Sequence, residues 1–130
     1  MLFAASIAAT SPGPSISGYN ASEALVSTFA QALREEPKGS GVTLTAPMPG
    51  PNDTEFVDRA HTGDTRLGTG PKGSAAGIAH EAFDAVIAGK DRVVAGSVKN
   101  TVKAVAGHVV PDPALAAQHR KMSETGTDAD

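Results

Sequence analysis

Two hydroxyl side chains are the groups in this sequence whose types and spacing best suit catalysis. Tyr19, the only tyrosine, lies at the start of a predicted helix, after a predicted strand and a turn. Ser6 ends that strand. Because the carboxyl ends of parallel strands and the helix starts that follow them share one edge of an α/β sheet, both hydroxyls are expected to converge there. One donor that polarises a carbonyl oxygen and a second that delivers a proton would suit carbonyl reduction. The alternative for Tyr19 alone is a half-buried aromatic with a hydrogen-bonded hydroxyl.

The elements that must position these hydroxyls alternate between strands and helices. Apolar or β-branched runs, each followed by glycine, proline or serine, predict strands at Leu2–Ala5, Val42–Ala46 and Arg92–Gly96. Apolar residues at steps of three and four predict helices at Tyr19–Glu36, Ala75–Ile87 and Val98–Val109. This order predicts parallel strands joined by crossovers. We expect an α/β fold, a partial Rossmann-like three-layer sandwich with a small parallel sheet of about three strands and helices on its faces. Pro47 removes one hydrogen-bond donor near the end of an interior strand.

Composition narrows the class of protein. The chain has 130 residues, no cysteine and a formal net charge of −3. A single domain is expected at this length, and the absence of thiols excludes a disulfide scaffold and thiol catalysis. The negative charge gives no long-range attraction to nucleic acids or to anionic membranes. The apolar start Leu2–Ala9 is too short to span a bilayer and follows no basic residue. We expect a cytoplasmic protein with no nucleic-acid or membrane partner.

The histidines do not predict a metal site. His61, His80, His108 and His119 show neither the i, i+4 pairing nor the short ligand clusters that zinc and iron sites use. Surface or helix-end positions are the expected environment of all four.

Several spaced blocks of the sequence together resemble the second half of short-chain dehydrogenase/reductases. The resemblance covers nearly the whole chain and is carried by Ala5–Ala9, Pro12–Pro14, Tyr19–Ala24, Gly41–Ala46, Pro49–Thr54, Ala88–Lys90 and Val93–Ser97. It implies that residues 1–122 are the C-terminal part of such a domain. The residues after Met122 are polar, and we expect 123–130 to form a disordered tail. The complete form would transfer hydride between NAD or NADP and a small-molecule alcohol or carbonyl substrate.

The resemblance also implies roles for individual residues. Ser6 matches the substrate-orienting serine and Tyr19 the catalytic acid/base, which also contacts the cofactor. The loop that would lie against the nicotinamide contains Pro49, Gly50, Asn52 and Thr54. From the residues alone, this proline- and glycine-rich segment is either a rigid turn or a loop that lets the backbone approach a ligand closely.

Glu23 departs from the family pattern, in which a lysine stands four residues after the tyrosine. Residues four apart share one helix face, so the side chain at position 23 is expected beside Tyr19. A lysine would favour the phenolate and donate to the cofactor ribose. A carboxylate disfavours the phenolate by like-charge repulsion and has no donor when ionised. The alternative is that Glu23 is a solvated charge in a site without function.

The family's glycine-rich strand, turn and helix precede the part represented in these residues. Gly68–Gly73 matches G-x-G-x-x-G literally, but a polar, aperiodic segment precedes it rather than a buried strand, so we interpret it as a loop. Cofactor-binding energy is therefore expected to be lost, and we expect the chain alone to be inactive, although whether it is an enzyme stays open. The alternatives are a non-enzymatic interaction or oligomerisation module, including a homo-oligomer, and a gene remnant.

Overall fold

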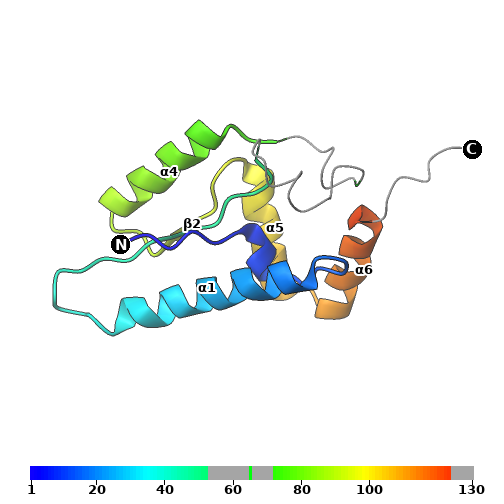
Figure 1. The fold of residues 1–130 in the computed structure, drawn as a ribbon, viewed down its shortest axis with the longest axis horizontal. Helices are drawn as coiled ribbons and strands as arrows, with labels where there is room; N and C mark the ends of the chain where they lie inside the picture. Colours follow the sequence, from blue (N-terminus) through cyan, green and yellow to red (C-terminus); the bar gives the residue numbers. More distant parts are fainter. Residues whose placement is uncertain (53–64, 66–71, 124–130) are drawn as a thin grey trace, which may run out of the picture.

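The computed structural model describes residues 1–52, 65 and 72–123. Two long helices lie on opposite sides of a short central layer of extended chain, and two further helices follow towards the C-terminus (Figure 1). The elements in chain order are the 3₁₀ helix η1 (Ile7–Thr10), α1 (Ser17–Glu35), β1 (Ala46–Pro47), α4 (Ala75–Ile87), β2 (Arg92–Val93), α5 (Val98–Val109) and α6 (Asp112–Ser123). The predicted α/β class is confirmed, and the arrangement is compatible with a partial Rossmann-like fold.

The sheet is parallel, but it is shorter than the sequence suggested. β1 and β2 pair with Ala46 opposite Arg92 and Pro47 opposite Val93. The expected first strand forms only one bridge, between Leu2 and Thr45.

Two prolines explain the missing strand pairing at the N-terminal segment. Phe3, Ala5 and Ile7 donate their N–H groups to the carbonyls of Thr45, Pro47 and Pro49, at 3.0, 2.9 and 3.1 Å. In a parallel ladder the N–H groups at positions 47 and 49 would return bonds to that segment, but proline has no N–H. The Thr45 N–H still donates to the Met1 carbonyl at 3.0 Å, but beyond Thr45 the hydrogen bonds are donated only by the N-terminal segment.

α1 forms as predicted, but small residues make its most buried face. Asn20, Ser27 and Ala30 are its buried residues, and they let the helix approach the strands closely. Ala30 packs with Leu44 and Ala46 in the hydrophobic core, with Phe3 and Leu33 packed against it. Leu25 and Phe29 also belong to the apolar spacing of this helix, but their side chains are 68% and 51% exposed, although the Phe29 ring packs edge-on against Phe3.

The C-terminal helices depart most from expectation. α5 lies where the sequence predicted a helix, but its buried residues are Asn100 and Ala104. Four valines whose spacing places them on one face of this helix are exposed: Val98, Val102, Val105 and Val109. α6 was not predicted; it begins at Asp112, and Pro113 suits a first helical turn, where proline removes no helical hydrogen bond.

The predicted tail falls mainly outside the described residues. Ser123 is the last residue of α6, and 124–130 lie beyond the described part. Within the part that the structure describes, no helix has both the length and the apolar character needed to cross a membrane.

Candidate functional site

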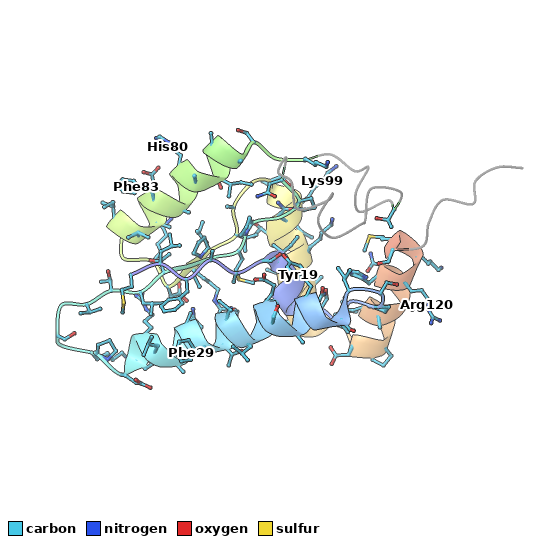
Figure 2. The ribbon with its side chains drawn as sticks, viewed as in Figure 1. Tyr19, Phe29, His80, Phe83, Lys99 and Arg120 are labelled. Atoms are coloured by element: carbon cyan, nitrogen blue, oxygen red, sulfur yellow. The ribbon has the colours of Figure 1, made fainter. Side chains whose placement is uncertain are left out.

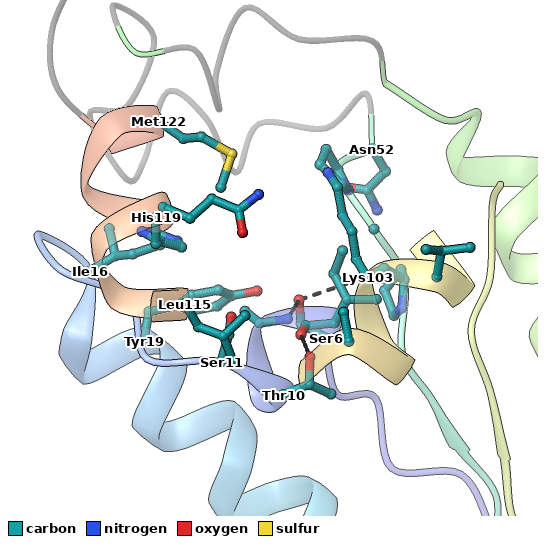
Figure 3. A pocket seen from close by; sticks show the side chains of 18 residues that line it. Ser6, Thr10, Ser11, Ile16, Tyr19, Asn52, Lys103, Leu115, His119 and Met122 are labelled. Carbon is teal, nitrogen blue, oxygen red and sulfur yellow. Dashed lines mark hydrogen bonds between the residues drawn. The ribbon is translucent and has the colours of Figure 1, made fainter. Parts of the chain in front are cut away.

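A pocket of about 570 Å³ lies where the end of the N-terminal segment, the start of α1, the loop after β1, α5 and α6 meet. Figure 3 shows side chains from these elements surrounding one space. The volume is in the range of small-molecule sites. Its described lining residues are Ser6, Ile7, Ala8, Thr10, Ser11, Ile16, Tyr19, Pro49, Gly50, Pro51, Asn52, Val102, Lys103, Ala106, Leu115, Gln118, His119 and Met122.

Ser6 is held at the pocket by the helix that it caps. Its Oγ accepts a hydrogen bond from the Ala8 N–H at 3.2 Å, which is an N-cap interaction at the start of η1. The same hydroxyl lies 3.5 Å from the Pro49 carbonyl oxygen and within hydrogen-bond reach of Tyr19. The cap fixes the serine between the two predicted parts of the site.

The turn before α1 determines where Tyr19 enters the pocket. Asn20 is buried, and its side-chain amide donates to the Ser11 carbonyl at 2.8 Å. Gly13 packs directly on this side chain, because a Cβ at position 13 would overlap the amide of Asn20. Ser15 has a positive φ of 72°, an uncommon conformation for a residue other than glycine, which turns the chain into the helix. The neighbouring Tyr19 is thereby held at the first turn.

Tyr19 bonds to both residues that the sequence analysis placed near it. Its oxygen accepts a hydrogen bond from Ser6, and its hydroxyl donates to the carboxylate of Glu23. Burial raises the pKa of Tyr19 above its usual 10.0, the bond from Ser6 lowers it, and the charge and hydrogen bond of Glu23 raise it further. The phenol is therefore held in its protonated form.

Glu23 is itself in an unfavourable environment for a charge. Burial raises the pKa of its carboxyl group, and the hydrogen bond from Tyr19 opposes this effect. Its Oε2 is buried and has no hydrogen-bond partner among the described residues. Glu23 does not line the pocket itself, so it acts there through Tyr19.

The loop after β1 is anchored by Asn100, a residue that sequence analysis missed. The Asn100 side chain donates to the Ala95 carbonyl at 3.2 Å, and Gly50 packs so closely on it that a Cβ at position 50 would overlap the amide. The Gly50 N–H in turn donates to Ala95 at 3.4 Å. Pro49, Gly50 and Asn52 all line the pocket. Thr54, the last predicted member of this loop, lies outside the described residues.

α6 closes one side of the pocket, and His119 faces it from that helix. The prediction of a surface or helix-end position was wrong for His119, which is 8% exposed. Its Nδ1 lies 2.9 Å from the Ser123 hydroxyl, and it also bonds to the backbone of Pro14. Burial lowers the pKa of His119, so the ring is neutral at pH 7. His80 and His108 are exposed, as predicted. Sequence analysis did not predict this wall, because the end of α6 is polar, with Arg120 and Lys121 in its last turn, and the helix has a low mean hydropathy.

Comparison with known protein families gives one match. Residues 1–64 match the family described as short chain dehydrogenase. The match covers 64 of the 130 residues and supports a fragment similar to this family. The matched segment contains Ser6, Tyr19 and the loop from Pro49 to Asn52, and it supports an oxidoreductase relationship. A search of curated proteins found no match to the chain.

The matched segment thus brings a serine and a tyrosine hydroxyl into contact at a pocket, and the tyrosine is also bonded to a carboxylate. Two hydroxyls in this arrangement can donate to one carbonyl oxygen and stabilise the negative charge that develops on it. The hydrogen bond to Glu23 competes for the Tyr19 proton. The arrangement is suited to hold and polarise a carbonyl group and poorly suited to remove a proton from an alcohol.

Proposed function

We propose that these residues form the substrate side of an NAD(P)-dependent oxidoreductase site that acts on alcohols and carbonyl compounds. The observation that carries the proposal is the hydrogen bond between Ser6 and Tyr19 at the edge of a 570 Å³ pocket. The pair lies in the segment that matches the short-chain dehydrogenases, which supports the same chemistry.

A carbonyl oxygen that enters the pocket would accept hydrogen bonds from Ser6 and Tyr19. These bonds withdraw electron density from the carbonyl carbon and favour attack on it. The predicted nicotinamide contacts fit this geometry, since Pro49, Gly50 and Asn52 line the same pocket as the hydroxyls. Thr54 is proposed as a further contact. A bound NAD(P)H would supply the hydride.

Glu23 would limit the proton transfer that completes the reaction. The Tyr19 proton is donated to the carboxylate, and delivery to a substrate oxygen requires that this bond be broken. In the reverse direction the tyrosine must act as a base, and the Glu23 charge disfavours the phenolate. The 130 residues also contain no glycine-rich turn that directly follows a predicted strand and could hold the pyrophosphate. We therefore propose that the chain alone does not turn over NAD(P)H.

Turnover assays test this proposal. The purified chain is mixed with NADH or NADPH and a panel of ketones and aldehydes, and absorbance at the nicotinamide band is followed. We expect no turnover from the natural chain or from Glu23→Lys, because the lysine restores the local charge but not the affinity for the rest of the cofactor. Turnover by the natural chain that Tyr19→Phe abolishes would overturn the proposed inactivity.

The non-enzymatic alternative rests on a different feature, the exposed valines of α5. Val98, Val102, Val105 and Val109 recur at steps of four, three and four residues, which places them along one helix face. Such a face suits packing against a helix of a second copy, and a homo-oligomer is proposed on this ground. Size-exclusion chromatography with light scattering tests it, and a monomer at high protein concentration would argue against this role.

A further inference from the structure

The two C-terminal helices contribute four apolar side chains to the pocket, beside the polar Lys103, Gln118 and His119. Val102 and Ala106 lie one turn apart on α5, and Leu115 and Met122 lie two turns apart on α6. Leu115 is buried, whereas Val102 is exposed, so part of this apolar surface is open to solvent. Binding is favourable when an apolar ligand displaces water from apolar side chains. The pocket therefore favours a ligand with an apolar body.

The same pocket contains one formal positive charge among its described lining residues, that of Lys103. His119 is neutral, because burial lowers its pKa. Lys103 forms no ion pair with another described residue. The ion pairs among the described residues join Lys38 to Glu35 and Arg92 to Asp91.

The Lys103 charge is separate from the hydroxyl pair. Lys103 is not among the groups that shift the pKa of Tyr19, whereas Glu23 is. Lys103 therefore does not replace the lysine that the family has at position 23. In Figure 3 its side chain extends from α5 along the side of the pocket that carries Asn52. The pocket thus combines the hydroxyl pair, a separate positive charge and apolar side chains from α5 and α6.

We propose that the substrate of this site is a carbonyl compound with an apolar body and a carboxylate, with its carbonyl at Ser6 and Tyr19 and its carboxylate beside Lys103. This inference rests on the proposed function and adds the class of substrate. The Met122 side chain of α6 contacts the apolar body. The site discriminates against neutral analogues because only the carboxylate neutralises the charge of Lys103.

Binding measurements without cofactor test the substrate class. The probes are 4-benzoylbenzoate, which has a ketone, two rings and a carboxylate, and its amide, 4-benzoylbenzamide. We expect the carboxylate to bind about five-fold more tightly, the upper end for a charge pair open to solvent. Lys103→Met removes the charge but keeps an apolar side chain, and it should abolish the preference. Lys99→Met on the same helix is the matched control, since Lys99 does not line the pocket, and it should keep the preference.

Methionine methyl NMR tests the position of the ligand. The chain has three methionines, Met1, Met48 and Met122. We expect 4-benzoylbenzoate to shift the Met122 methyl signal and to leave the exposed Met1 unchanged. Equal affinity for the two probes, no binding of either probe, no effect of Lys103→Met, or an unshifted Met122 signal would each overturn the proposal.

A third probe separates this proposal from the proposed function. 4-Benzylbenzoate has a methylene group where 4-benzoylbenzoate has its carbonyl, so it cannot accept hydrogen bonds from Ser6 and Tyr19. We expect it to bind more weakly than the ketone. Equal binding of these two carboxylates would count against the hydroxyl pair and hence against the proposed function, while sensitivity to Lys103→Met would still support the anionic class of ligand.

Discussion

Replacing Glu23 with glutamine tests whether a carboxylate controls the ionisation of Tyr19. Glutamine keeps the shape of the side chain and an oxygen that can accept the tyrosine proton, but it removes the charge. The charge and the hydrogen bond of Glu23 both raise the pKa of Tyr19. We therefore expect the pKa of Tyr19 to fall in Glu23→Gln.

The magnitude follows from the contact between the two groups. Two like charges about 4 Å apart repel by about 4 kcal/mol at an effective dielectric constant of about 20. Solvent reaches both side chains, since neither Tyr19 nor Glu23 is fully buried. Interactions between partly exposed charges are commonly reduced to about 1 kcal/mol by screening. We expect the free energy of ionising Tyr19 to fall by about 1 kcal/mol.

The composition of the chain makes this measurement direct. Tyr19 is the only tyrosine and there is no tryptophan, so the ultraviolet absorbance of tyrosinate between pH 8 and 12 follows this one group. Circular dichroism recorded on the same samples shows whether the chain stays folded over this range. A folded chain is required because the effect of Glu23 exists only where the two side chains are in contact.

Glu36→Gln is the matched control for the charge. Glu36 caps the other end of α1, and thirteen residues of helix separate it from Glu23, a distance of about 20 Å. That distance exceeds the screening length of about 10 Å at 0.1 M salt. The control should leave the titration of Tyr19 unchanged. A pKa of Tyr19 that stays the same or rises in Glu23→Gln would refute the electrostatic argument.

Two further predictions concern stability. Gly50→Ala should lower the free energy of unfolding by about 1–3 kcal/mol, because a Cβ there overlaps the buried Asn100 side chain. Gly18→Ala is the control, since a Cβ at position 18 meets only open space and should not destabilise the chain. Equal urea midpoints for the two variants would contradict this account. The free energy of unfolding should also decrease as the pH falls below about 6.5, the usual pKa of histidine, since burial lowers the pKa of His119 and the unfolded chain therefore binds the proton first. Urea unfolding at pH 7.5 and 5.5 measures this loss, and His119→Gln should reduce it; the same loss in both proteins would exclude His119 as its cause.

The side chains shown in Figure 2 illustrate why the helix faces were harder to predict than the helices. Phe83 on α4 points away from the strands, and Phe29 on α1 is half exposed even though its ring packs edge-on against Phe3. Periodicity identifies a helix and an apolar stripe, but it does not say whether another element covers that stripe. The small residues Ala30, Ala82 and Ala85 face inward instead, because they allow helix and strand to approach closely.

The sequence contains the reason why the sheet is short. Pro47 and Pro49 can be read from the chain directly, and their missing N–H groups explain why Leu2 and Thr45 form a single bridge. The sequence analysis noted Pro47 but still expected a full third strand. The α6 wall had no comparable signal, since a helix with mixed polar and apolar residues gives weak periodicity.

The sequence by itself determined the order of the elements and the chemical groups of the site. Helical spacing places Glu23 beside Tyr19 whatever the rest of the chain does, because residues four apart share a helix face. Tertiary structure alone decided which distant residues join them. The packing of α5 and α6 decides three features of the site: the contact of Asn100 with Gly50, the burial of His119, and the position of Lys103 and Met122 at the pocket. This packing depends on the fit of surfaces that are far apart in sequence.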